Sequence, residues 1–298
     1  MDTLVRALLS WEWRVDVLLV ILTLATLYFL GWRRLRQRQQ PLANKWRLAS
    51  YAGGMLVIAI ALMSPIDVLG TQLFWVHMVQ HLLLVMVAPP LLFLGSPFPV
   101  GVWGLPRTGR LMIGRLLNRR SLLRNGLDRL SSPVIVWFVF VSLLWGWHEP
   151  AAYDAALRYE WVHDLEHLCF FGIGMLYWWR LTGAAPFFSR RLSPVQKILY
   201  ALSVVPPNMI VGVVLSFAGQ PTYTHYQTVP RISDLSVLED QHFGGLIMWI
   251  PGSMMYIMVA LYYLFRMLDG ENKGGESPYL PPVQTEPSQA LSDELQGT

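Results

Sequence analysis

Two pairs of histidines are spaced so that each pair can hold one metal ion. His77 and His81 stand four residues apart, and so do His163 and His167. Residues at this spacing share one face of a helix, about 40° apart around its axis, so two neutral imidazoles reach a single ion together. Glu166 stands beside the second pair, and carboxylates commonly orient metal-binding imidazoles. The spacing therefore predicts a metal site shared by two helices.

Four other side chains are candidates for the surroundings of this site. His148, Asp240 and His242 are expected to support the two pairs or to line the path by which an ion arrives. Met248 follows His242 by about two helical turns. A thioether together with imidazoles suits Cu(I), so copper, as Cu(I), is the metal expected. The complete set of candidate metal-site residues is His77, His81, His148, His163, Glu166, His167, Asp240, His242 and Met248.

Two other interpretations of the histidines stay open. The segment HDLEH, residues 163–167, matches the H-x-x-E-H pattern of a class of zinc peptidases. It opens an apolar segment with no obvious soluble catalytic domain around it, which disfavours a peptidase. The second interpretation is a haem bound by one histidine from each pair. Histidines at i and i+4 cannot bind opposite faces of one haem, so the doubled spacing favours a small ion.

The composition indicates an integral membrane protein. Of the 298 residues, 54% are hydrophobic and 14% are charged, whereas about 25% are charged in an ordinary soluble domain. The single cysteine, Cys169, excludes an intrachain disulfide and a C-x-x-C metal site. Phosphate-binding and nucleophile motifs such as G-x-G-x-x-G and G-x-S-x-G are absent from the sequence. We therefore expect no enzyme.

Seven segments are apolar and long enough to cross a bilayer, which takes about 20 residues. Membrane spans of this length are expected to be helical, because a helix satisfies its own backbone groups in lipid. The fold predicted is therefore an all-α polytopic bundle over residues 1–268, followed by a polar, disordered cytoplasmic tail over 269–298. The seven predicted spans are 15–32, 47–63, 73–95, 132–148, 161–181, 195–218 and 243–266.

The basic residues predict the orientation of the bundle. Of the 23 lysines and arginines, 19 fall on one side of the predicted spans, mainly in the connections 33–47 and 96–131. Such an excess marks the cytoplasmic side, so the N-terminus is expected outside and the C-terminus in the cytoplasm. All seven histidines then lie on or near the outer side. The basic charge is thus a signal of topology, and no nucleic-acid partner is expected.

Prolines interrupt three of the predicted spans. They occur in Ala88-Pro89-Pro90, in Val205-Pro206-Pro207-Asn208 and in Pro251-Gly252. Proline removes a backbone donor and kinks a helix. Membrane helices tolerate this where neighbours or a cavity satisfy the freed groups. The interruptions predict either packing kinks or a polar interior near Asn208.

Several motifs resemble the CtaG family of bacterial cytochrome c oxidase assembly factors. The resemblance extends from about Trp46 to Arg266. The motifs that carry it are His77-x-x-x-His81, Ala88-Pro89-Pro90-Leu91-x-x-x-Gly95-x-Pro97, Trp147-His148-x-Pro150 with Tyr153, Glu166-His167 with Trp178-Trp179, and Asp240-Gln241-x-x-Gly244-Gly245-x-x-Met248-Trp249.

The resemblance implies a multi-pass protein of the bacterial plasma (inner) membrane that provides copper to the catalytic subunit of a haem–copper oxidase. The expected partners are oxidase subunits, the lipid bilayer and a periplasmic or extracellular copper donor. Two alternatives stay open: a transporter of copper or another solute, and a metal-free scaffold for oxidase assembly. A transporter needs polar groups along its whole path, and the cytoplasmic halves of the predicted spans hold few.

Overall fold

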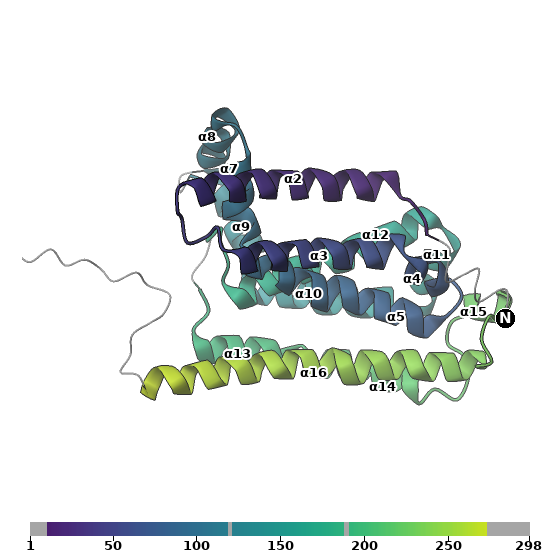
Figure 1. Cartoon of the computed structure of the whole chain (residues 1–298). Coiled ribbons are helices and arrows are strands. Elements are labelled where there is room, and N and C mark those ends of the chain that lie inside the picture. Colours follow the sequence, from purple (N-terminus) through teal and green to yellow (C-terminus); the bar gives the residue numbers. More distant parts are fainter. Residues whose placement is uncertain (1–10, 119–120, 188–190, 273–298) are drawn as a thin grey trace, which may run out of the picture.

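The computed structural model describes residues 11–118, 121–187 and 191–272, and every regular element in these ranges is helical. The all-α fold predicted from the sequence is confirmed. Long helices run side by side along one common direction, and shorter ones join their ends (Figure 1). The elements are α2 (Val15–Gln37), α3 (Lys45–Met63), α4 (Pro65–Gly70), α5 (Phe74–Leu82), the π-helix η1 (Leu83–Val87), α6 (Ala88–Leu94), α7 (Pro97–Gly104), α8 (Arg107–Leu116), α9 (Leu122–Leu130), α10 (Pro133–Trp147), α11 (Pro150–Arg158), α12 (Glu160–Thr182), α13 (Pro194–Ser203), α14 (Val205–Ser216), α15 (His225–Thr228) and α16 (Val237–Asn272).

Length and hydropathy identify several of these helices as membrane spans. Five continuous helical stretches in the described residues pass both tests: α2, α3, the run from α5 through η1 to α6, the run of α13 and α14, and residues 237–270 of α16. A sixth passes if the bent pair α9 and α10, which meet at 59°, forms one span. The protein is therefore a multi-pass membrane protein. Helix α12 has 23 residues, enough to cross a bilayer, but it lies outside that set. Seven spans and the orientation of the N-terminus stay predictions.

The first proline interruption creates a contact between α12 and the run of α5, η1 and α6. Neither Pro89 nor Pro90 has an N–H, so the carbonyl of Val85 loses the donors that would follow it in an α- or π-helix. The indole Nε1 of Trp178 in α12 donates to this carbonyl at 2.8 Å. A methyl group at Gly174 would lie 3.2 Å from the Cα of Val85, so α12 approaches η1 closely there. The kinked segment is thus the place where this helix contacts α12.

The second interruption also finds its partner within the protein. The predicted sixth span divides at Val204 into α13 and α14. Asn208 is buried, and its amide donates to the carbonyl of Met248 in α16 at 2.9 Å. The polar interior predicted near Asn208 is therefore occupied by a hydrogen bond between α14 and α16.

The third interruption does not end a helix. Pro251 lies inside the 36-residue helix α16, which continues past it to Asn272. The first four residues of the predicted tail, 269–272, therefore belong to this helix. The rest of that tail, 273–298, lies outside the described residues.

An ion pair joins the N-terminal end of α2 to the start of α12. Arg14 donates to both carboxylate oxygens of Asp164, and its Nη2 lies 2.8 Å from Oδ2. These hydrogen bonds and those to Asp16 raise the pKa of the guanidinium, since they favour its charged form. The pair fixes α12 at the end of the bundle where both histidine pairs occur.

Replacing Trp178 by phenylalanine is expected to destabilise the fold by about 1–3 kcal/mol, because the buried carbonyl of Val85 loses its donor. Thermal unfolding in detergent micelles measures the loss. Trp161→Phe is the matched control, since that indole lies on the same helix and is 69% exposed. Equal melting temperatures for both variants would contradict the role assigned to Trp178.

Candidate metal centre

The structure brings the two histidine pairs together. One donor atom from each of His77, His163, Glu166 and His167 lies within 4.8 Å of the other three. His81 joins them, because its Nε2 lies 2.8 Å from the Nε2 of His77. The imidazole rings of His81 and His167 have centroids 5.5 Å apart. The predicted convergence of imidazoles from two helices is thus present in the structure.

Parallel helices explain this convergence. His77 and His81 are the fourth and eighth residues of α5, and His163 and His167 are the fourth and eighth residues of α12. Equal positions lie side by side when two helices run parallel from the same level. The contact between Trp178 and Val85, further along both helices, keeps them in this alignment.

The cluster is buried and rich in polar atoms without partners. His77 and Glu166 are fully buried, and His163 is the least buried of the group at 9%. Among the described residues, the Nε2 atoms of His163 and His167 and both carboxylate oxygens of Glu166 have no hydrogen-bond partner. Buried polar groups are usually hydrogen-bonded, because leaving them unpaired is costly. A cation at this point would give the two imidazole nitrogens and one carboxylate oxygen a partner.

The distances suit metal coordination better than hydrogen bonding. Glu166 Oε2 lies 3.6 Å from His77 Nε2, and Oε1 lies 3.7 Å from His81 Nε2. Both distances exceed the usual hydrogen-bond range. Two ligand atoms that each lie about 2 Å from one ion are roughly 3–4 Å apart, so these donors can share an ion.

His148 approaches the cluster from a third helix. It follows the last residue of α10, and its ring centroid lies 6.3 Å from that of His81. Its Nδ1 lies 2.6 Å from the carbonyl oxygen of Leu144, so Nδ1 carries the proton and donates. The other nitrogen, Nε2, is buried and has no hydrogen-bond partner in the part of the chain that the structure describes. A backbone carbonyl commonly fixes a metal-binding histidine in this tautomer.

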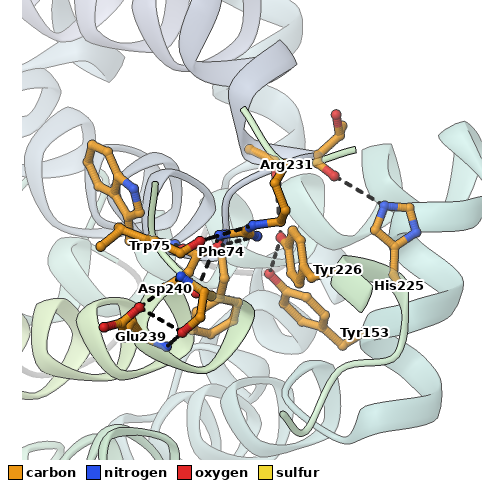
Figure 2. Close-up of polar contacts among 12 residues, drawn as sticks. Phe74, Trp75, Tyr153, His225, Tyr226, Arg231, Glu239 and Asp240 are labelled. Atoms are coloured by element: carbon orange, nitrogen blue, oxygen red, sulfur yellow. Dashed lines mark hydrogen bonds and ion pairs between the residues drawn. The ribbon is translucent and has the colours of Figure 1, made fainter. Parts of the chain in front are cut away.

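The predicted site residue Asp240 caps α5. Its two carboxylate oxygens accept the backbone N–H groups of Phe74 and Trp75 at 3.1 and 3.0 Å, the first two residues of the helix that carries His77. Arg231 also donates to this carboxylate, at 3.3 Å. Figure 2 shows Asp240 between the start of α5 and Arg231. Asp240 therefore positions the helix that carries His77.

His242 and Met248 are also placed outside the cluster. The Nε2 of His242 lies 2.9 Å from the carbonyl oxygen of Ala218. Met248 packs in the apolar core that includes Phe74 and Met78, and its own carbonyl accepts from Asn208. Both residues join α16 to its neighbours. The thioether expected beside the imidazoles is thus part of the packing.

Two buried groups beside the cluster were not singled out from the sequence as site residues. The ring of Tyr153 lies 5.2 Å from that of His77, and its hydroxyl is 3.1 Å from the hydroxyl of Tyr226, as Figure 2 shows. Gln80 donates to the carbonyl of Ala61 and to the carboxyl of Asp67. Tyr153 belongs to a motif of the family resemblance, but nothing in the local sequence pattern marks Gln80.

Comparison with known proteins bears on the function of this cluster. Residues 26–269 match the family described as cytochrome c oxidase caa3 assembly factor (Caa3_CtaG). Uncharacterized proteins of Mycobacterium bovis and Mycobacterium tuberculosis are each 30% identical over 270 residues, which are 87% of this chain and 39% of theirs. An uncharacterized protein of Mycobacterium leprae is 27% identical over 260 residues, 84% of this chain and 38% of its own. The chain thus spans about two fifths of the length of these relatives. No solved structure matches.

Asp67→Asn is expected to change how stability depends on pH. Burial raises the pKa of Asp67 from 3.8 to about 6, so the protonated carboxyl favours the folded state. That contribution is fully present below about pH 4 and is lost as the pH rises through 6. The variant should therefore match the wild type at pH 4 and exceed it at pH 7, by up to about 3 kcal/mol.

Thermal unfolding of both proteins across this range measures the difference. Asp234→Asn, which removes one exposed carboxylate, controls for the change in net charge. A difference between Asp67→Asn and the wild type that stays constant from pH 4 to 7 would contradict the assignment.

Proposed function

The chain belongs to the family of cytochrome c oxidase caa3 assembly factors, and we propose that it holds copper in the histidine–glutamate cluster for delivery to the catalytic subunit of the oxidase. The description of the family names the oxidase that is assembled. The donor atoms of the cluster support copper as the ion that is carried. In this proposal the chain is a carrier in the bacterial plasma membrane, and it catalyses no reaction.

The observation that carries the proposal is the set of donors. His77, His163, Glu166 and His167 offer four atoms within 4.8 Å of one another, and imidazole is a good ligand for copper. Because Met248 packs elsewhere, no thioether supports the choice of Cu(I). The net charge of the site supports Cu(I) instead. The charge of one Cu(I) ion and the charge of the Glu166 carboxylate sum to zero, and a buried site disfavours an uncompensated charge.

The depth of the cluster supports loading from one membrane face. His81 and His167 are the eighth residues of their helices, so they lie ~10 Å from the helix ends. By the distribution of basic residues, these ends face the outside. A copper donor on the outer side, periplasmic or extracellular, is then the natural source of the ion. A transporter would need a polar path to the other face, where the described polar group Asn208 is already bonded to α16.

A carrier must also release its ion, and the helix that carries His77 and His81 has an irregular segment next to the site. The π-helix η1 begins two residues after His81. Single-turn π-helices are rare, and they occur frequently at functional sites. In this proposal the contact between Val85 of η1 and Trp178 must rearrange before His77 and His81 move relative to α12.

His163→Ala is expected to weaken Cu(I) binding by ~100-fold or more, because loss of a supporting partner alone costs 10–100-fold. Anaerobic competition of the purified protein against a chromophoric Cu(I) chelator measures the affinity. His242→Ala is the matched control, since its imidazole bonds to Ala218 outside the cluster. It should bind as the wild type does.

Two outcomes would contradict the proposal. If His163→Ala binds Cu(I) as tightly as the wild type, the cluster is not the site. If the wild-type protein binds no copper but still co-purifies with oxidase subunits, the chain is a scaffold for assembly.

A further inference from the structure

The cluster contains more donors than one ion needs. A four-coordinate ion is satisfied by four ligands. His77, His163 and His167 supply three imidazoles, and Glu166 supplies one carboxylate oxygen. His81, His148 and the other oxygen of Glu166 are then left over. All three donors are buried, so bulk water does not satisfy them.

Glu166 faces two different histidines with its two oxygens. Oε2 lies closer to His77, at 3.6 Å, and Oε1 lies closer to His81, at 3.7 Å. A carboxylate that presents its oxygens in two directions can bridge two metal ions. Ions in such two-metal sites are about 3.5–4 Å apart.

The contact between His77 and His81 fits the same arrangement. Their Nε2 atoms are 2.8 Å apart, so one nitrogen carries a proton and the other accepts it. Metal binding requires deprotonated nitrogens and therefore releases such a proton. Once this proton has left, each nitrogen has a lone pair to offer, so the two imidazoles can serve different ions.

His148 completes the second position. Its Nδ1 is committed to Leu144, which leaves the lone pair of Nε2 free. Its ring lies 6.3 Å from that of His81, and Phe170 packs against both rings at 6.0 and 4.5 Å. The two imidazoles therefore lie close to each other, and the apolar ring of Phe170 packs beside them.

We propose that the cluster holds two copper ions bridged by Glu166, one bound by His77, His163 and His167 and the other by His81 and His148. This inference rests on the proposed function, because both positions take the same cargo. Monovalent ions suit it better than divalent ones, since two Cu(I) ions with one carboxylate leave a net charge of +1, whereas two Cu(II) ions would leave +3 in the same buried site. The second position has two imidazoles instead of three, so its ion is the more readily exchanged.

Stoichiometry under anaerobic Cu(I) titration tests the proposal. The expected result is two ions per chain for the wild type and for His242→Ala, and one ion for His148→Ala and for the more conservative His148→Gln. Using both variants guards against a loss that reflects misfolding, and thermal unfolding of each apoprotein checks its fold. X-ray absorption of the loaded wild type should show a copper–copper distance of about 3.5–4 Å, absent from both His148 variants.

The outcomes separate this inference from the proposed function. One ion in the wild type, with no copper–copper distance, overturns the two-ion site and leaves the proposed function standing. Two ions retained in both His148 variants overturn the assignment of His148. No copper in the wild type removes the proposed function and this inference together.

Discussion

The contact between α12 and the helix that runs through α5, η1 and α6 is the constraint on which the site depends. Two prolines leave the carbonyl of Val85 without a helical donor, and Trp178 supplies one. Gly174 lets the two backbones approach. In lipid an unpaired carbonyl is strongly disfavoured, so this contact fixes how the two helices align. The histidines, at equal positions near their starts, are thereby brought face to face.

The donor atoms of the cluster are positioned by residues that lie outside it. Five buried imidazoles and one carboxylate come from three helices, and the groups that position them make their own contacts outside the cluster. Asp240 caps α5, Leu144 fixes the tautomer of His148, and Arg14 holds the start of α12. The donor atoms themselves are left for a ligand. A site built in this way is rigid around its rim and unsatisfied at its centre.

Local patterns in the sequence predicted much of this arrangement. Hydrophobic segments predicted the helices, and i, i+4 spacing predicted that each histidine pair shares a face. The role of Asp240 could not be predicted, because it caps a helix that begins 166 residues earlier in the chain. Met248 was expected beside the imidazoles from its spacing to His242, yet Met248 packs in the apolar core and His242 contacts Ala218, just after α14. Spacing within one helix says nothing of which neighbour that helix will face.

The π-helical segment Leu83–Val87 also sets the rotational phase of everything that follows it. A hydrogen bond from i to i+5 encloses one residue more than the α-helical bond, which turns the downstream side chains by about 100°. With this offset His77 and His81 face α12 while Leu92 packs onto Gly54 of α3. Deleting a single residue here would remove this offset, turn the downstream side chains back by about 100° and force one of those two surfaces away from its neighbour. The register of the whole third apolar segment thus depends on one extra residue.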